Sequence, residues 1–447
     1  MKYFSTNKNS PLVDFKEATI KGQAPDKGLY FPETIPGFAP EMIERIEKLS
    51  DGEIAFRVIR PYVGNTIGEE KLFSIVSETI NFPLPLVKLD EDIFSLELFH
   101  GPTLAFKDVG ARFMSRCLEY FVTGQGAASD LTARDAISGP SRKVTVLVAT
   151  SGDTGGAVAD GFYGVEGVNV VILYPSGKVS PVQEKQLTTH GKNIQALEIQ
   201  GNFDDCQQMV KQAFTDPDIN RKLFLTSANS INVARWLPQQ FFYFLAYKQW
   251  ADKNHPPVIA VPSGNFGNIA AGLLAMRSGL PVSHFIAACN VNDIASDFLE
   301  TGIVRPKQAV PTLSNAMDVG DPSNFIRVLE LFGHDLTAIK NNLSAFTVTD
   351  KDTSNTIREL FNKYDYLADP HGAVGFKALQ EYLFKTGQKG IFLETAHPVK
   401  FPDAVEKATG QKIDLPGSLE PVMRKEKHSI FMQPVFAELK EYLLNRY

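Results

Sequence analysis

The chain has 447 residues, too many for one typical hydrophobic core, so we expect two or three domains. Apolar residues make up 43% of it and charged residues 21%, as in ordinary globular proteins. Its net charge of −6 provides no basic surface, so we expect no binding to nucleic acid or to an anionic membrane.

The remaining composition gives no sign of disulfides, metals or membrane segments. The three cysteines, Cys117, Cys206 and Cys289, are far apart and odd in number, which argues against a disulfide framework or a zinc site. The eight histidines are scattered without the spacing of metal ligands, so we expect no metal. The N-terminus lacks the apolar segment of a secretory signal, and no apolar run approaches the ~20 residues that span a bilayer. We therefore expect a cytoplasmic protein with no membrane segment.

Residues 1–95 lack a repeating strand–helix rhythm and are expected to form an N-terminal, mainly helical unit. Residues 28–38 are rich in turn formers, whereas 41–49 and 69–80 carry helical spacing. Pro83 and Pro85 then break the pattern.

A lysine in the next segment has the features of a reactive amine. After the turn at Gly101-Pro102, Thr103 can cap a helix on which Leu104, Lys107, Ala111 and Met114 share one apolar stripe. Burial in such a stripe lowers the pKa of an ammonium group, and a neutral lysine can attack a carbonyl to form a Schiff base. A lone lysine in a stripe more often extends its ammonium to solvent, so the rest of the chain must decide between the two interpretations.

A regular alternation of strands and helices follows a small, polar stretch at 124–142 that we interpret as an exposed, dispensable loop. Strands are predicted at 144–149, 168–174 and 194–199, each followed by a helix, and a second series begins at Leu223 with strands at 258–261, 285–288 and 391–394. This pattern predicts two parallel-sheet α/β domains, a smaller one over 96–215 and a larger one over 216–447. Catalytic loops are expected at the carboxyl ends of the strands, in the cleft between the domains.

A glycine-containing turn after the strand at 258–261 has the composition of a phosphate site. It reads Pro262-Ser-Gly-Asn-Phe-Gly-Asn268 and opens a helix, so Gly264 and Gly267 permit close backbone approach while the free N–H groups of the helix point at the ligand. The turn matches neither a dinucleotide fingerprint nor a Walker loop. The alternative is a purely structural turn.

Three further segments offer polar groups after predicted strands. The turn at 150–156 provides Ser151, Gly152, Asp153 and Thr154, which could receive a carboxylate at a helix N-terminus. The segment at 229–235 provides Asn229, Ser230, Asn232 and Arg235, a possible site for a substrate phosphate, although a capped helix with an exposed arginine would give the same pattern. Thr395 directly follows the strand predicted at 391–394.

One reactive lysine and two helix termini that can bind anions are the groups that pyridoxal 5′-phosphate requires, so the separate predictions support one another.

The chain resembles the threonine synthases of the bacterial and fungal type over nearly its whole length. The matching motifs are Tyr30-Phe-Pro, Glu97-Leu-Phe-His-Gly-Pro-Thr-Leu-Ala-Phe-Lys-Asp108, Ala149-Thr-Ser-Gly-Asp-Thr-Gly155, Ser227-Ala-Asn-Ser-Ile-Asn232, Pro262-Ser-Gly-Asn-Phe-Gly267, Leu313-Ser-Asn-Ala-Met-Asp318 and Thr395-Ala-His-Pro398. The resemblance implies a fold-type II pyridoxal-phosphate enzyme, related to tryptophan synthase β, that converts O-phospho-L-homoserine and water to L-threonine and phosphate.

The resemblance also implies roles for individual residues. Lys107 would hold the cofactor as an imine and act as acid and base, and Thr395 would face the pyridine nitrogen. Ser151 to Thr154 would receive the substrate carboxylate. The cofactor phosphate would lie on the loop made of Gly264, Asn265, Phe266, Gly267 and Asn268.

Three questions stay open at this level. Dehydration of serine or threonine by the same cofactor is the nearest alternative activity, and it would need no second anion site such as 229–235. A non-catalytic homologue that binds phosphorylated ligands would be expected to lack the lysine or the phosphate loop. The chain is expected to be a monomer or a small homo-oligomer; if Arg235 does not hold the substrate phosphate, the region of Ser77 and Thr79 is the next candidate.

Overall fold

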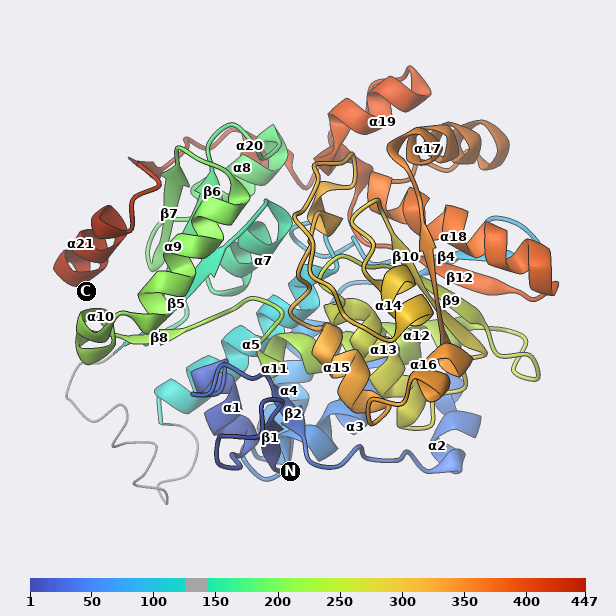
Figure 1. The fold of residues 1–447 in the computed structure, drawn as a ribbon, viewed down its shortest axis with the longest axis horizontal. Coiled ribbons are helices and arrows are strands. Elements are labelled where there is room, and N and C mark those ends of the chain that lie inside the picture. Colours follow the sequence, from blue (N-terminus) through green and yellow to red (C-terminus); the bar gives the residue numbers. More distant parts are fainter. Residues whose placement is uncertain (125–142) are drawn as a thin grey trace.

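Two separate β-sheets form the framework of the computed structural model, which describes residues 1–124 and 143–447 (Figure 1). Residues 125–142 of the stretch predicted to be an exposed loop lie outside this description. The smaller sheet has the order β13-β7-β6-β5-β8, and its neighbouring strands are parallel throughout. The strands are β5 (Val144–Ala149), β6 (Val168–Pro175), β7 (Ile194–Ile199), β8 (Phe224–Thr226) and β13 (Ser429–Met432).

The larger sheet has six strands in the order β11-β10-β9-β12-β4-β3. All neighbours are parallel except β3 and β4, which are antiparallel. The strands are β3 (Leu86–Lys88), β4 (Ile93–Glu97), β9 (Val258–Pro262), β10 (His284–Cys289), β11 (Leu343–Thr347) and β12 (Gly390–Glu394). Strands β9, β10 and β12 are buried at every residue, because helices cover both faces of a sheet of this kind.

Helices cover both faces of the smaller sheet. Alternate residues of β5 enter different cores: Val146 and Val148 belong to the large central core, whereas Leu147 and Ala149 belong to the core formed with α9, α10 and α21. The helices around this sheet are α5 (Lys107–Val122), α7 (Asp153–Gly161), α8 (Pro181–Thr188), α9 (Phe203–Thr215), α10 (Pro217–Lys222) and α21 (Phe436–Arg446).

The larger sheet is covered in the same way. Ile259 and Val261 of β9 join the central core with α12 and α13, whereas Val258 and Ala260 pack with α18 on the other face. The helices of this part are α11 (Val233–Trp236), α12 (Gln240–Gln249), α13 (Gly267–Arg277), α14 (Ala295–Thr301), α15 (Phe325–Leu331), α16 (Leu336–Asn342), α17 (Asp350–Tyr364), α18 (Pro370–Thr386) and α19 (Pro402–Thr409). The short helix α20 (Glu420–Met423) instead packs against α8, beside the smaller sheet (Figure 1).

The N-terminal segment packs beneath both sheets and shares the central core (Figure 1). It contains an antiparallel pair of short strands, β1 (Tyr3–Ser5) and β2 (Tyr30–Pro32), in addition to helices. The helices are α1 (Phe15–Lys21), α2 (Pro40–Glu44), α3 (Asp51–Val63) and α4 (Glu69–Thr79). The Tyr3 hydroxyl donates to the carbonyl of Tyr62 on α3 at 2.7 Å, and this hydrogen bond fixes the β1–β2 pair against α3.

The strand pairings do not follow the predicted domain division at residues 95 and 215. Strands β3 and β4 belong to the larger sheet, although they precede residue 96 or straddle it, and β8 and β13 belong to the smaller sheet although they follow residue 215. The helix α21 also packs on the smaller sheet through Leu439 and Leu443. The prediction is wrong at these segments because the chain crosses between the sheets several times. Within the described part of the chain, no helix has the length and apolar character needed to cross a membrane.

Candidate active site

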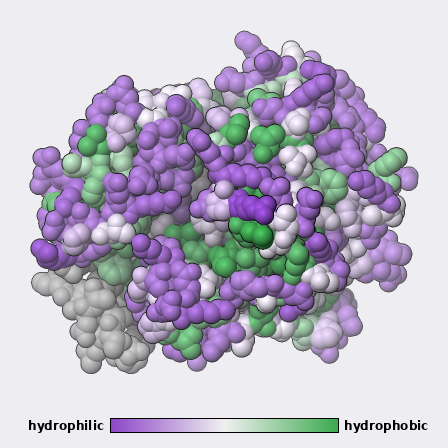
Figure 2. Space-filling model, in the orientation of Figure 1, coloured by the Kyte–Doolittle hydropathy of each residue, from purple (hydrophilic) through white to green (hydrophobic). Residues whose placement is uncertain are grey.

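A cavity of about 970 Å³ lies between the two sheets, where the carboxyl ends of their parallel strands face each other. Figure 2 shows this face hollowed at its centre, where apolar side chains are visible between polar rims. The cavity is lined by Lys107 and by most of the other residues that the sequence singled out: Ser151, Asp153, Thr154, Asn229, Ser230, Arg235, Gly264, Asn265, Phe266, Gly267, Asn268 and Thr395. Gly152 and Asn232 do not line it.

Lys107 is the first residue of α5, so the helix begins after Phe106 and not directly after Thr103. Phe106 occupies the N-cap position, and Leu104 lies in the preceding turn with a φ of 57°. Thr103 does not cap the helix, because its backbone N–H donates to Asp108 Oδ2 at 2.9 Å and its hydroxyl donates to Asp108 Oδ1. The predicted helix start is therefore three residues too early, and Leu104 lies outside the helix, whereas Lys107, Ala111 and Met114 lie on α5 at the predicted spacing.

The Lys107 side chain is 19% exposed, and its Nζ lies 4.6 Å from the centroid of the Phe106 ring. Burial lowers its pKa below the ordinary value, and the carboxylate of Asp153 opposes this effect only in part. A lysine with a lowered pKa has a larger neutral fraction near pH 7, and the neutral form is the nucleophile and the proton acceptor.

Asp153 lies between Lys107 and a second lysine, Lys400. Its Oδ1 is 2.8 Å from Lys400 Nζ and accepts from Gln183 Nε2 at 2.9 Å, while its Oδ2 is 3.9 Å from Lys107 Nζ. Burial by itself would raise the pKa of Asp153, but the two ammonium groups hold it well below its usual range. A carboxylate that is ionised and already paired would repel a substrate carboxylate, so the side chain of Asp153 is not suited to the binding role predicted for it. Gly152 turns the chain ahead of it, with a φ of 137°.

The loop at 264–268 runs from β9 into α13 as predicted. Phe266, at the N-cap, has a left-handed backbone with a φ of 60°, and Phe266, Gly267 and Asn268 line the cavity at the start of α13, where the first N–H groups of a helix have no partner within it. A Cβ on Gly264 would lie 2.5 Å from the Cα of Met317, so this glycine allows the 315–318 segment to approach the loop. A Cβ on Gly267 would meet Ser230 Cβ at 3.3 Å, a much milder contact.

Asn268 shows that the loop fits an anionic group. Its Oδ1 accepts from the Tyr243 hydroxyl at 2.8 Å, whereas its buried Nδ2 has no hydrogen-bond partner within the described residues. A buried donor without an acceptor is unfavourable, and a phosphate oxygen in the cavity would satisfy it. The residues present therefore fit the phosphate of pyridoxal 5′-phosphate, with Lys107 in the same cavity.

The segment after β8 contains one residue that is not available for a ligand. Asn232 caps α11, since its Oδ1 accepts from the N–H of Ala234 at 2.9 Å and its Nδ2 donates to the carbonyls of Thr19 and Ser227. We therefore withdraw the prediction that Asn232 binds substrate. Asn229 and Ser230 do reach the cavity, and the Ser230 hydroxyl accepts from Asn265 Nδ2 at 2.8 Å.

Arg235 is buried at the cavity wall, not exposed on a helix surface, with 4% of its surface accessible. Its Nη1 donates to the carbonyl of Ala228 at 2.5 Å, and its Nε has no partner among the residues that the structure describes. Burial lowers the pKa of Arg235 to about 10, although the carboxylate of Asp108 opposes this change. A buried guanidinium with a free donor favours an anionic ligand. Ser77 and Thr79 lie on α4 and do not line this cavity.

Two residues at or beside the cavity are not singled out by any sequence pattern. Lys400 is fully buried and pairs with Asp153, and His371 lines the cavity wall. The Nε2 of His371 accepts from the N–H of Ala316 at 3.2 Å, which assigns the proton to Nδ1, where it bonds to Asp369 Oδ1 at 2.5 Å. The only sequence signals are their positions beside the Thr395-Ala-His-Pro and Asp369-Pro-His segments.

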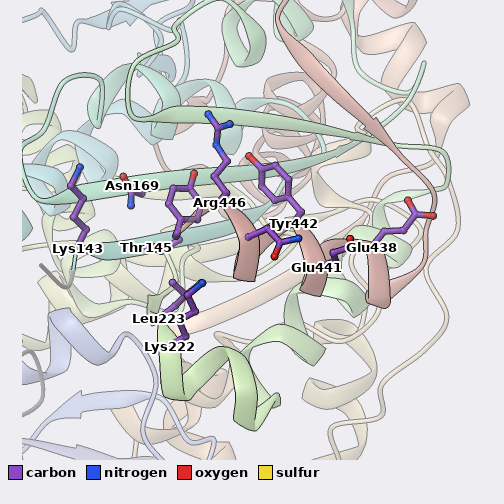
Figure 3. Close-up of a pocket in the computed structure, with 11 residues that line it drawn as sticks. Lys143, Thr145, Asn169, Lys222, Leu223, Glu438, Glu441, Tyr442 and Arg446 are labelled. Carbon is purple, nitrogen blue, oxygen red and sulfur yellow. The ribbon is translucent and has the colours of Figure 1, made fainter.

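A second cavity, of about 1000 Å³, lies at the opposite end of the smaller sheet (Figure 3). Thr145 and Asn169, near the starts of β5 and β6, face Tyr442 and Arg446 of α21 there. It contains none of the predicted site residues, because those follow the carboxyl ends of the strands. Across residues 1–124 and 143–447, no three His, Cys, Asp or Glu side chains are grouped so as to hold a metal ion.

Comparisons with known proteins identify the family. The chain matches the family models described as "Threonine synthase N terminus" over residues 2–80, "Pyridoxal-phosphate dependent enzyme" over 78–391 and "Threonine synthase, C-terminal" over 372–443. It is 42% identical to the threonine synthase of Haemophilus influenzae, with 99% of this chain and 100% of that protein covered. The chain belongs to the threonine synthase family.

Solved structures of the family have the same fold. The crystal structure of threonine synthase from Escherichia coli is 42% identical, with a TM-score of 0.90 and full coverage of both chains. A pyridoxal-phosphate-bound threonine synthase from Brucella melitensis is 37% identical, also with a TM-score of 0.90, over 100% of this chain and 99% of that one. The predicted family, fold-type II class, cofactor and enzyme activity are therefore confirmed.

Proposed function

We propose that this cavity holds pyridoxal 5′-phosphate through Lys107, the 264–268 loop and Thr395, and that it converts O-phospho-L-homoserine and water to L-threonine and phosphate. The observation that supports the assignment of residues is that two buried donors without partners among the described residues, Asn268 Nδ2 and Arg235 Nε, belong to residues of the cavity that contains Lys107. The first turn of α13 with Asn268 would form one anion site, and Arg235 would form the other. A substrate that carries its own phosphate needs the second site in addition to the one for the cofactor.

The cofactor, when bound, supplies an aldehyde that captures amino groups and a ring that withdraws electrons from the substrate carbon attached to the amine. Lys107 moves the protons. The reaction removes a proton from Cα and one from Cβ as phosphate leaves Cγ, and it returns protons at Cγ and Cα as water adds at Cβ. The lowered pKa of Lys107 allows one amine to accept and donate protons near neutral pH.

The substrate carboxylate is assigned to the N-terminus of α7. Ser151 and Thr154 line the cavity there and supply hydroxyls, and the first turn of the nine-residue helix supplies N–H groups. The negative charge of the Asp153 side chain excludes it from this role, and the carboxylate instead pairs with Lys107 and Lys400.

Arg235 is assigned to the leaving phosphate. The charge of its buried guanidinium and its unpartnered Nε would both be satisfied by a phosphate oxygen. Asn229 and Ser230, at the same wall, border this position. Neutralising the charge that develops on a departing phosphate would lower the barrier to its release.

Phosphate release from O-phospho-L-homoserine, with identification of the amino acid formed, tests the activity. We expect equimolar phosphate and threonine. Formation of 2-oxobutanoate or pyruvate from threonine or serine as the main reaction, without phosphohomoserine turnover, would support dehydration instead.

All three cysteines are buried free thiols, which supports a reducing compartment such as the cytoplasm. The oligomeric state stays a prediction.

A further inference from the structure

Lys400 is a fully buried lysine with two fixed contacts. It is the last residue of a short 3-10 helix at Pro398–Lys400, and its side chain has 0% exposure. Its Nζ lies 2.8 Å from Asp153 Oδ1 and donates to the carbonyl of Thr103 at 2.8 Å. Burying a lysine costs free energy unless its charge is paired, so its position requires Asp153.

The two oxygens of Asp153 have different partners. Lys400 and Gln183 both hold Oδ1, at 2.8 and 2.9 Å, whereas Oδ2 faces Lys107 Nζ at 3.9 Å. The carboxylate is thus positioned by groups other than Lys107. Its orientation and its counter-charge remain when the Lys107 amine gives up its proton.

We propose that Lys400 is a positioning residue for the reaction, which keeps Asp153 ionised and paired so that Lys107 can alternate between charged and neutral forms inside a buried site. The inference rests on the proposed role of Lys107. With all three groups present, the cluster has a net charge of +1 when Lys107 is protonated and 0 when it is neutral. Without Lys400, the neutral amine would leave a buried carboxylate with no cation, so Lys107 would retain its proton.

Charges on other elements act on the same amine. Arg235 of α11 favours its neutral form, as Lys400 does, and Asp369, which caps α18, favours its charged form, as Asp153 does. Burial is the largest cause of the lowered pKa of Lys107. Since Arg235 and Asp369 are present in every variant considered below, changes at Lys400 and Asp153 isolate the contribution of this cluster.

The test measures the protonation of Lys107 directly in the full-length chain freed of cofactor. Competitive labelling with trace acetic anhydride between pH 6 and 11, read by mass spectrometry of the Lys107 peptide, gives the fraction of neutral amine. Lys400→Met should raise the apparent pKa of Lys107 by about one unit, so that labelling at pH 8 falls roughly tenfold. Lys400→Arg keeps the charge and should stay within about threefold of the parent. Asp153→Asn should shift the pKa in the opposite direction.

The opposite signs of the two shifts distinguish this role from a purely structural one, because general loosening of the site would move both variants the same way. The exposed Lys363 serves as an internal reference whose labelling profile should not change. If circular dichroism shows that Lys400→Met does not fold, Lys400→Gln takes its place and is compared with Asp153→Asn. Unchanged Lys107 profiles in the variants, or shifts of one sign, would overturn the proposal. Borohydride labelling of a different lysine would overturn the proposed function instead, while leaving these profiles measurable.

Discussion

The side-chain amide of Asn265 donates a hydrogen bond to the hydroxyl of Ser230 across 2.8 Å. Asn265 follows β9 of the larger sheet, and Ser230 follows β8 of the smaller one. The Ser230 hydroxyl also accepts from Asn324 Nδ2 at 2.9 Å, and the Oδ1 of Asn265 accepts from the N–H of Ser323. The loop assigned to the cofactor phosphate and the segment assigned to the substrate phosphate are therefore fixed to each other, although they belong to different sheets.

The assignment of Lys107 can be tested by chemical trapping. Borohydride reduction in the presence of pyridoxal phosphate should fix a pyridoxyl group on the peptide that carries Lys107, as read by mass spectrometry. Lys107→Ala should lose turnover of phosphohomoserine by at least about 10³-fold, because its proton transfers have no replacement. Lys363→Ala, at an exposed position, is the control and should keep full activity. A label on another lysine would disprove the assignment.

The two loop glycines are predicted to differ. Gly264→Ala places a Cβ 2.5 Å from the Cα of Met317, so backbone must move and the midpoint of thermal unfolding should fall. Gly267→Ala approaches side-chain atoms only, with Ser230 Cβ the nearest at 3.3 Å, and should leave that midpoint almost unchanged. If the cofactor phosphate lies against this turn, Gly267→Ala should still weaken cofactor binding, measured by absorbance titration. Cofactor affinity equal to that of the parent would make Gly267 a structural residue.

Much of the framework could be predicted because local signals are strong in parallel sheets. The strand predicted at 194–199 matches β7 residue for residue, and the turns at 150–154, 264–268 and 395 follow strands that the sequence identifies. The structure brings all three turns to one cavity. Elements that depend on distant partners could not be predicted: β4 at 93–97 pairs with β12 at 390–394, and no local pattern encodes that pairing.

The details of the site show the same limit. The true start of α5 depends on Asp108, whose carboxylate holds Thr103 and so prevents it from capping the helix. Asn232 has the composition of a ligand-binding amide, but the carbonyl of Thr19, more than two hundred residues away, occupies its donor. The importance of Lys400 becomes visible only when the fold places Asp153 beside it.

Arg235 provides the test of the substrate-phosphate site. A hydrogen bond to a charged group contributes roughly 1.5–3 kcal/mol, so Arg235→Ala should lower kcat/KM for phosphohomoserine by about 10–150-fold. Cofactor affinity and any slow reaction with serine should be spared. Arg235→Lys, which keeps a charge at the buried position, separates charge from geometry and should recover part of the loss. The exposed Arg305→Ala is the control. Equal losses with both substrates would mean that Arg235 supports the fold or the cofactor.

Glu394 predicts an unusual dependence of stability on pH. It is fully buried at the end of β12, where its Oε1 accepts from the N–H of Asp369 at 2.5 Å. Burial and the neighbouring carboxylate of Asp369 raise the pKa of Glu394 well above its ordinary value. A carboxyl group with a raised pKa in the folded state stabilises the fold below its unfolded pKa, near 4.5, and this contribution is lost as pH rises toward the folded value.

Glu394→Gln should therefore stabilise the protein at pH 8. An amide carries no charge and can donate a hydrogen bond as the protonated acid does. We expect the midpoint of thermal unfolding to rise by about 2–4 °C, the shift that ~1 kcal/mol produces in a large domain, and the difference from the parent to disappear near pH 4. Glu166→Gln, at an exposed position, should show no such pH-dependent gain. A variant that is less stable than the parent at pH 8, with a deficit that shrinks toward pH 4, would show instead that Glu394 is ionised and paired in the folded state.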